Sequence, residues 1–313
     1  AATWPAATID CLAHPKRREV LENLSFLRHV GGITRRTSHW RGWLTNKRYD
    51  LAFVCGQDKA LVRYAVRVAH QVVALGQGEP TLDSRLWRRV ELPLFQSVHA
   101  VEMQLALTDA LGLARDGLYL SYRVTSEEDE WARQQLAQDF RSGVGRPLVG
   151  LQVASFPTKA YRDWPIENFV TLCKHILSRH PDAAFLIFGG KVERDRTRYL
   201  HKSLSGYSIE YAGKLTLRQT AALMNRVDLY IGVDTGPTHI MGALHRPMVA
   251  LYHGYSPSRL LAPLEHPCLY VVDHPRAGNC GPEASMNEIS VDSVWHQVEL
   301  ALGEIGGSCA SPS

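Results

Sequence analysis

The sequence predicts an α/β protein of two domains, each built around a parallel sheet, and three observations support this fold class. Apolar runs alternate with helical patterns along residues 146–303, and the runs are apolar at consecutive positions rather than at every second one. Residues 1–143 repeat the alternation more weakly. Consecutive apolar residues are typical of strands covered by helices on both faces, and a chain of 313 residues has the length of two domains.

In the first domain (1–143) the patterns are short but ordered. They predict, along the chain, a strand over 7–13, a strand over 50–56, a helix over 59–70, a strand over 71–76 and a helix over 98–113. The charged stretch "SEEDEWARQQLAQDFRSGVGRP" then predicts a helix that ends in glycine and proline. We therefore expect the domain boundary near Gly143–Arg146.

The second domain (146–303) has the clearer pattern. It predicts strands over 146–154, 183–190, 208–213, 228–233 and 247–253. Helices are predicted over 167–180, 192–204, 217–226 and 237–245, with a terminal amphipathic helix over 289–303. Two such domains would form a cleft in which the carboxyl ends of their strands face each other. Ligands of open α/β sheets bind at those ends, so we expect the ligand in this cleft. Residues 304–313 are predicted to be a disordered tail.

Composition excludes several classes of protein. No apolar run reaches the ~18 residues of a membrane-spanning helix, and the start of the chain lacks the features of a signal peptide. The six cysteines are scattered, which predicts reduced thiols in a cytosolic protein rather than a zinc site or a disulfide framework. Residues 1–100 hold 15 lysines and arginines against 8 acidic residues, so this part either faces an anionic partner or is merely solvated. No nucleic-acid-binding motif accompanies the basic run "RRTSHWRGW", and we expect no nucleic-acid partner.

The stretch "GVDTGPTHIMGAL" predicts an anion site where a buried strand turns into a helix. Backbone N–H groups at a helix N-terminus attract phosphate. Gly236 would cap the helix and allow close approach, Pro237 suits the first helical position, and Thr235 offers a hydroxyl. Asp234 would accept backbone N–H bonds or meet a ligand hydroxyl, with His239 orienting it. The alternative is an ordinary strand–turn–helix corner with a core histidine.

Other polar residues follow neighbouring strands of the same predicted sheet. Lys159 and Arg162 come after its first strand, and Glu193 in "GGKVE" follows the second. The third strand is followed by "AGKLT". Carboxyl ends of parallel strands share one edge of a sheet, so these residues converge on one place. We interpret the convergence as a nucleotide site, with cations for phosphate and a carboxylate for ribose hydroxyls.

The stretch "GKLTLRQTAALMNRVDLYIGVDTGPTHIMGALHRPMVALY", with "YRDWPIENF" upstream, resembles the heptosyltransferases of lipopolysaccharide core synthesis, glycosyltransferase family 9. "YDLAFVCGQDKA", "HAVEMQLALTDALGL" and "MNEISVDSVWHQVELAL" are also similar to the family. The resemblance implies a GT-B fold of two Rossmann-like domains, an inverting mechanism, and neither metal nor cofactor. It also implies an ADP-heptose donor and, as acceptor, an anionic Kdo-containing lipid A precursor at the cytoplasmic face of the inner membrane.

The resemblance also assigns roles to single residues. Asp234, Thr235 and Gly236 fall on the motif that meets the donor phosphates, and His239 is the motif histidine. Arg162 occupies the place of a phosphate-binding lysine; arginine offers a bidentate fork where lysine offers a point charge. Glu193 matches a residue that contacts ribose, and Lys214 and Leu215 fall where the adenine pocket is lined.

One departure concerns catalysis. Family members open with a strand, a Gly-Asp turn and a helix, and that aspartate is the general base. "AATWPAATIDCLA" resembles the end of that helix and the following strand, so we expect the first strand–helix unit to be absent from this sequence. Asp58 is the nearest substitute base, unless it is an ordinary surface aspartate. A non-catalytic sugar-nucleotide-binding protein and a UDP-sugar epimerase of the same architecture remain alternatives.

Overall fold

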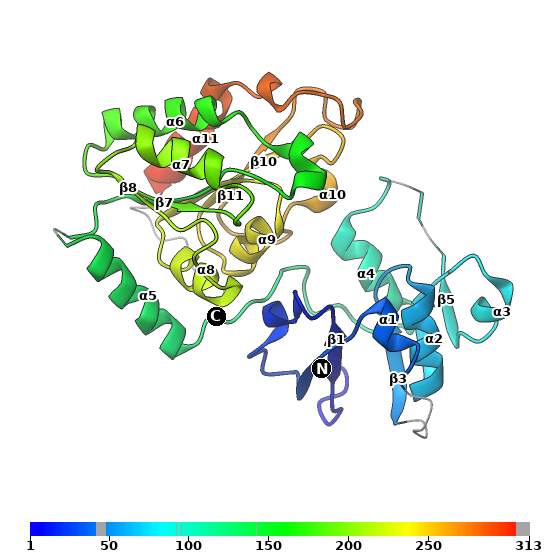
Figure 1. Cartoon of the computed structure of the whole chain (residues 1–313). Helices are drawn as coiled ribbons and strands as arrows, with labels where there is room; N and C mark the ends of the chain where they lie inside the picture. Colours follow the sequence, from blue (N-terminus) through cyan, green and yellow to red (C-terminus); the bar gives the residue numbers. More distant parts are fainter. Residues whose placement is uncertain (42–47, 92, 95, 142, 305–313) are drawn as a thin grey trace. The chain divides into compact units, whose positions relative to one another are not determined.

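The computed structural model shown in Figure 1 describes residues 1–41, 48–91, 93–94, 96–141 and 143–304. The chain divides into two compact units, Ala1–Leu118 and Tyr119–Ser313. This division lies before the boundary near Gly143–Arg146 that the sequence indicates. Helix α5 (Ser126–Asp139) lies between the two positions, and it buries Ala132 and Leu136 in the core of the second unit.

The second unit is built on one six-stranded sheet whose strands are all parallel. Its strands, in chain order, are β6 (Leu148–Gln152), β7 (Ala184–Phe188), β8 (Ser208–Glu210), β9 (Leu229–Val233), β10 (Met248–Tyr252) and β11 (Leu269–Asp273). In space the order is β11-β10-β9-β6-β7-β8. The direction of winding therefore reverses between β6 and β9. In Rossmann-like sheets, ligands bind at the carboxyl ends beside this reversal.

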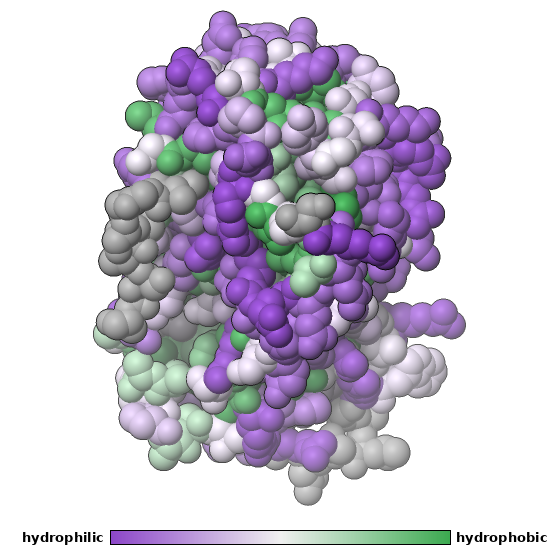
Figure 2. All heavy atoms as spheres, turned by 90° about the vertical axis from the view of Figure 1, so that its left-hand side faces the viewer, coloured by the Kyte–Doolittle hydropathy of each residue, from purple (hydrophilic) through white to green (hydrophobic). Residues whose placement is uncertain are grey.

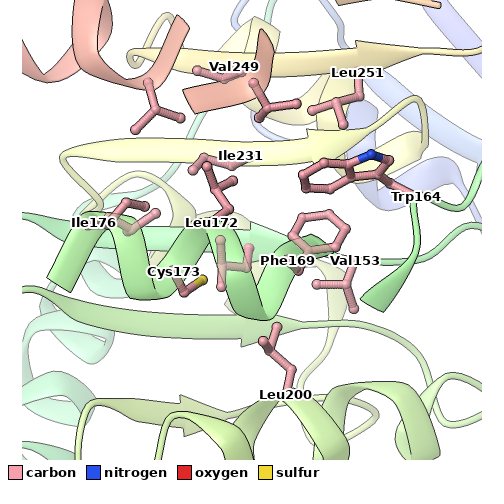
Figure 3. Close-up of a cluster of buried hydrophobic side chains, with 14 of the residues drawn as sticks. Val153, Trp164, Phe169, Leu172, Cys173, Ile176, Leu200, Ile231, Val249 and Leu251 are labelled. Carbon is pink, nitrogen blue, oxygen red and sulfur yellow. The ribbon is translucent and has the colours of Figure 1, made fainter. Parts of the chain in front are cut away.

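Helices cover both faces of this sheet, as the sequence predicts (Figure 1). One face carries α6 (Ile166–Arg179), α7 (Arg194–Ser203) and α11 (Val291–Glu304), and the other carries α5, α8 (Leu217–Met224) and α9 (Gly236–Ala243). Figure 3 shows the first of these cores, where α6 lays Phe169, Leu172 and Ile176 against the strands. These three positions lie on one side of a helix, so a helical conformation lets the segment bury all three against the sheet. The short elements η2 (Pro157–Arg162), α10 (Ser258–Leu261) and η3 (Met286–Glu288) complete the unit.

The first unit contains two smaller parallel sheets. Strands β1 (Asp10–Ala13) and β2 (His29–Gly32) form one, and β3 (Tyr49–Val54), β4 (Ala69–Leu75) and β5 (Arg88–Val90) form the other in that order. Helix α2 (Lys59–Val68) connects β3 to β4 and buries Val62 and Val66. The remaining helices are η1 (Arg18–Leu21), α1 (Arg35–Ser38), α3 (Pro80–Asp83) and α4 (Ala100–Asp109).

The face of the molecule seen in Figure 2 is mainly hydrophilic. Apolar residues appear there only in small patches between polar ones. Such scattered patches are normal for a protein surface and indicate no large apolar docking area on this face. Among the helices in the described ranges, none is both long and apolar enough to cross a bilayer.

Three strands were missed from the sequence, namely β2, β5 and β11. The segment "HVGG" of β2 contains two adjacent glycines, and the segment "RRV" of β5 contains two adjacent arginines. Their own preference for the strand conformation is weak, and hydrogen bonding to a neighbouring strand overrides it. The helix predicted to end at residue 303 ends at Glu304, so the first residue of the tail predicted over 304–313 is helical. The rest of that tail lies outside the described residues.

The prediction that all six cysteines are reduced thiols is wrong at Cys268, which is disulfide-bonded. Cys11, Cys55, Cys173 and Cys280 are free. Cysteine usage therefore does not establish the redox compartment.

Candidate functional site

The turn between β9 and α9 lies at the carboxyl end of β9, beside the winding reversal. Thr235, rather than Gly236, is the N-cap, and Gly236 and Pro237 are the first two helical residues. Thr238, fully buried, fixes the corner: its hydroxyl donates to the Val233 carbonyl at 2.5 Å and lies 2.9 Å from the Tyr230 hydroxyl. This role of Thr238 was not predicted from the sequence, because a threonine near the start of a helix can serve several structural purposes.

Gly236 faces open space in front of α9. A Cβ atom built at this position would meet no atom within 4 Å, and the backbone there does not have a positive φ. Neither the packing of the described residues nor the conformation therefore requires glycine. A glycine at the start of a helix that faces empty space suits the close approach of an anion to the N-terminal amides.

Asp234 is a buried carboxylate held between two basic side chains. Its residue is 2% exposed. The Arg162 Nη1 atom lies 2.6 Å from one carboxylate oxygen, and the His239 Nε2 atom lies 3.2 Å from the other. Neither oxygen has an aligned hydrogen bond, so the expected backbone N–H bonds to Asp234 do not form. Burial of a carboxylate is unfavourable without a partner, and here ionic contacts supply it.

Arg162 joins three strand ends. It belongs to η2, which follows β6, and its side chain is 18% exposed. Besides Asp234 after β9, it approaches Ser256 after β10, with Nη2 donating to the Ser256 hydroxyl at 3.3 Å. Its Nε donates to the Tyr161 hydroxyl at 3.2 Å. Ser256 and Tyr161 are residues of the candidate site that the sequence reasoning did not name. Tyr161 lies in "YRDWPIENF", where only Arg162 was given a binding role, and Ser256 lies in no recognised motif.

The loop that carries Arg162 and Lys159 is tied down by its own side chains. The Asp163 carboxylate accepts the Ser155 N–H at 2.7 Å, and the Ser155 hydroxyl donates to the Lys159 carbonyl at 2.6 Å. Burial raises the pKa of Asp163, although Ser155 and Arg196 act in the opposite direction. The Lys159 side chain is exposed, as a cation that receives a ligand from solvent must be.

Glu193 lies over the glycine pair that ends β7. It is the N-cap residue of α7, and its Oε2 atom is buried without a hydrogen-bond partner. A Cβ atom built on Gly190 would lie 2.5 Å from that oxygen. Gly190 thus leaves the space in which the carboxylate lies.

The loop after β8 adjoins the loop after β7. The Gly213 N–H donates to the Gly189 carbonyl at 2.8 Å, with Gly213 at φ +65°. Lys214 turns to Glu210, whose carboxylate lies 2.9 Å from its Nζ atom, and its side chain stays 53% exposed. Leu215 is partly buried against the sheet face that carries α8.

Unpartnered buried polar atoms gather at this edge of the sheet. Gln152 Oε1 lies at the end of β6, Glu193 Oε2 after β7, and the Tyr252 hydroxyl at the end of β10. The Asp234 carboxylate after β9 also has no aligned hydrogen bond, but its two oxygens already contact Arg162 and His239. Buried polar groups in native proteins are nearly always hydrogen-bonded, so such a concentration indicates where a ligand would supply partners. Two hollows among the described residues contain none of these atoms. One is lined by Gly78, Pro80, Asp83, Ser84 and Arg89, and the other by residues 139–141, 143–146, 181–184 and 206–207.

A comparison with known families decides the identity of the chain. The family model for glycosyltransferase family 9 (heptosyltransferase) matches residues 36–286. The chain belongs to glycosyltransferase family 9. The match covers parts of both compact units and the whole edge of the sheet described above, and it leaves out residues 1–35 and 287–313.

Curated relatives of this family 9 chain are lipopolysaccharide heptosyltransferases. Lipopolysaccharide heptosyltransferase 3 of Escherichia coli is 24% identical over 265 residues, which are 80% of this chain and 75% of that protein. Lipopolysaccharide heptosyltransferase 2 of Salmonella typhimurium strain LT2 is 25% identical over 287 residues, 85% of this chain and 79% of the relative.

Solved structures share the fold. E. coli ADP-heptose lps heptosyltransferase II superposes with a TM-score of 0.77 at 19% identity, covering 98% of this chain and 92% of that one. E. coli heptosyltransferase WaaC with ADP-2-deoxy-2-fluoro heptose gives a TM-score of 0.68 at 17% identity, covering 96% and 91%. The predicted GT-B fold with Rossmann-like domains is thereby confirmed.

Asp58, the candidate base of this family 9 chain, is the N-cap of α2. One carboxylate oxygen accepts the N–H groups of Ala60 and Leu61, and the other accepts Arg35 Nε at 2.5 Å. Burial raises the pKa of Asp58, but the bonds from Arg35 and Leu61 outweigh it and leave the pKa below the ordinary value. A carboxylate with a lowered pKa is a weaker proton acceptor.

Proposed function

We propose that this chain transfers heptose from ADP-heptose to a Kdo-lipid A type precursor of the lipopolysaccharide inner core, with inversion and without a metal ion. The observation that carries the proposal is the set of unpartnered buried polar atoms at the carboxyl edge of the β6–β10 region. A nucleotide sugar has the hydroxyl and amine donors that those oxygens lack. The names of the relatives, and the ADP-sugar in one neighbouring structure, support a heptose donor.

In this proposal the diphosphate lies in front of α9. Gly236 leaves the space, the Thr235 hydroxyl offers a neutral hydrogen bond, and Arg162 and Lys159 supply positive charge. Asp234 holds Arg162 through one oxygen and contacts His239 through the other, rather than binding phosphate, which a carboxylate repels. An arginine fork fits a diphosphate as well as a lysine does, with different geometry.

Glu193 would accept ribose hydroxyls through its unpartnered Oε2 atom. Lys214 and Leu215 would line the adenine, with Leu215 supplying apolar contact. For its ammonium group to contact the adenine ring, Lys214 would have to break its ion pair with Glu210. Its methylene groups could contact the ring with that ion pair intact.

In the reaction, these residues would stabilise the leaving group, which is the ADP diphosphate. As the glycosidic bond breaks, negative charge grows on the departing diphosphate, and fixed cations and helix amides stabilise it without rearranging. Among the residues described, His, Cys, Asp and Glu side chains form no group of three or more that would hold a metal ion. The acceptor hydroxyl needs a base, for which Asp58 stays the candidate from the sequence.

We also infer peripheral attachment at the cytoplasmic face of the inner membrane. The acceptor is anionic, and residues 1–100 carry the excess of positive charge. Trp40 is 84% exposed and lies among the exposed side chains of Arg36 and Arg41. Tryptophan beside basic residues suits the interface of an anionic bilayer.

A second candidate, a non-catalytic ADP-sugar-binding protein, is favoured by one observation. Both carboxylate oxygens of Asp58 already serve the cap of α2 and the ion pair with Arg35. Donor binding without transfer would distinguish this candidate from an enzyme.

Calorimetry and a transfer assay test the proposal. We expect ADP to bind the full chain equally with and without EDTA, and ADP-heptose to yield a heptosylated Kdo-lipid A that mass spectrometry detects. Absence of ADP binding contradicts the proposed donor site, and loss of binding in EDTA contradicts the metal-free site. Binding without any product supports the second candidate.

A further inference from the structure

Tyr161 lies between the two cations that are proposed to receive the diphosphate. Lys159 Nζ lies over its ring, 5.6 Å from the centroid, and the Arg162 guanidinium carbon lies 5.5 Å from the same point. Both distances are within the range of cation–π attraction. The phenol oxygen also accepts the Arg162 Nε–H at 3.2 Å. One side chain therefore contacts both cations.

The ring of Tyr161 is itself held by residues after β10. The His253 ring packs edge-on against it with the centroids 5.0 Å apart, and the Tyr255 ring lies 6.4 Å away. His253 is fully buried, its Nδ1 accepts the Tyr255 N–H at 3.0 Å, and its Nε2 lies 2.8 Å from the Ala284 carbonyl. Burial lowers the pKa of His253, although the Ala284 carbonyl opposes this. A neutral, doubly anchored ring is a rigid support.

The surroundings of the phenol are electropositive. Burial raises the pKa of Tyr161, but hydrogen bonds with Arg162 and Ser256 and the charges of Arg162 and Lys159 outweigh it, and the pKa falls below its ordinary value. The ring and its oxygen thus interact favourably with both cations. Without the ring, the exposed Lys159 would keep no described contact that directs its ammonium group toward Arg162.

We propose that Tyr161 is a positioning residue that holds Lys159 and Arg162 together for a diphosphate. The inference rests on the proposed function and adds a determinant that lies outside the Asp-Thr-Gly turn. A half-buried ring such as that of Tyr161 could instead stack on the nucleobase, and this role makes a different prediction. A stacking residue would contribute to the binding of adenosine, whereas a residue that positions cations contributes only when phosphates are present.

The test compares Tyr161→Ala and Tyr161→Phe with the parent chain by calorimetry, using ADP, AMP and adenosine. Tyr199→Ala, an exposed tyrosine on α7, serves as the matched control. Loss of two cation–π contacts should weaken ADP binding by about fivefold to thirtyfold in Tyr161→Ala and leave adenosine binding unchanged. Tyr161→Phe keeps the ring and should lose less than Tyr161→Ala.

A second arm tests the coupling directly. In a Lys159→Ala/Arg162→Ala background, Tyr161→Ala should have no further effect on ADP affinity, because the groups that it positions are gone. Thermal unfolding of each variant checks that the fold is kept. Three outcomes would overturn the inference. Tyr161→Ala binds ADP as tightly as the parent, or it loses as much affinity for adenosine as for ADP, or its effect on ADP affinity is as large in the Lys159→Ala/Arg162→Ala background as in the parent. Failure of the parent chain to bind ADP would instead overturn the donor site, and this inference with it.

Discussion

At the scale of single residues, the proposed site depends on a buried carboxylate that we expect to hold a cation rather than to bind phosphate. Asp234 contacts Arg162 and His239 with its two oxygens, so it fixes a cation at the edge of the sheet. Its burial makes each contact stronger than a surface pair, because the local dielectric is low. Thr235 differs in kind, since it is the N-cap residue of α9 but makes no side-chain bond to the helix amides. The two residues therefore allow a charged and a neutral contact to be compared.

Arg162→Ala should weaken ADP binding by roughly tenfold to a hundredfold, and Thr235→Ala by less. Hydrogen bonds to charged groups contribute ~1.5–3 kcal/mol, and neutral ones ~0.5–1.5 kcal/mol. Calorimetry with ADP and adenosine measures both variants, with Arg162→Lys and Thr235→Ser as the conservative controls. Adenosine has no phosphate and should bind all four like the parent. An unchanged ADP affinity in Arg162→Ala would leave Lys159 as the better candidate.

At the scale of elements, two helix N-termini in this chain are used in opposite ways. The amides that open α2 are satisfied by the Asp58 carboxylate. Those that open α9 receive no bond from the side chain of their N-cap, and Gly236 leaves the space before them open. A helix whose first amides are capped has little left for an anion, whereas an uncapped one is available. The difference predicts a structural role for α2 and a binding role for α9.

Asp58→Ala should destabilise the first unit by about 0.5–2 kcal/mol, the usual effect of losing an N-cap, and Asp58→Asn by less because asparagine also caps helices. Urea unfolding measures both. Since the folded-state pKa of Asp58 is lowered, its contribution is complete above the ordinary carboxyl pKa and is lost as the pH falls through the lowered value. A fall in turnover in Asp58→Asn at unchanged stability would instead identify Asp58 as the general base.

At the scale of the whole molecule, charge is divided between the two ends of the sequence. Residues 1–100 carry the excess of lysine and arginine, while the remainder of the chain is richer in acidic residues. Lys16, Arg17 and Arg18 lie exposed before β2 in the first unit. A field of this kind would attract an anionic acceptor.

Reversing the charge of Lys16, Arg17 and Arg18 to glutamate should raise the KM for the acceptor and leave ADP affinity unchanged. The matched control reverses Lys174, Arg198 and Lys202, three exposed basic residues of the second unit, and changes net charge by the same amount. Steady-state kinetics at two salt concentrations gives the result, and the difference should shrink at high salt because ions screen exposed charges. A parallel loss of ADP binding would indicate damage to the fold.

Most strands and helices of the second unit were predictable from sequence because their local patterns agree with their final burial. The exception among the strands is β11, which was missed and is mostly half-buried. Consecutive apolar residues in β6, β7, β9 and β10 indicate strands buried on both faces, and all are fully buried or nearly so. The first unit was less predictable, since short strands such as β5 are specified by their neighbours. The placement of the candidate phosphate and ribose residues at strand ends followed from the polarity of parallel strands alone.

The sequence by itself determined the alternation of strand and helix, the Asp-Thr-Gly turn at the end of β9 and the family, because these depend on patterns within short stretches. Tertiary structure decided which strand ends meet. Arg162 reaches Asp234 across 72 positions of the chain, and Ser256 across 94, only because β9 lies next to β6 and β10 next to β9. It also decided that Tyr161 contacts both cations. The physical reason is that periodicity records how deeply a residue is buried, whereas its partners are set by the order in which strands pack.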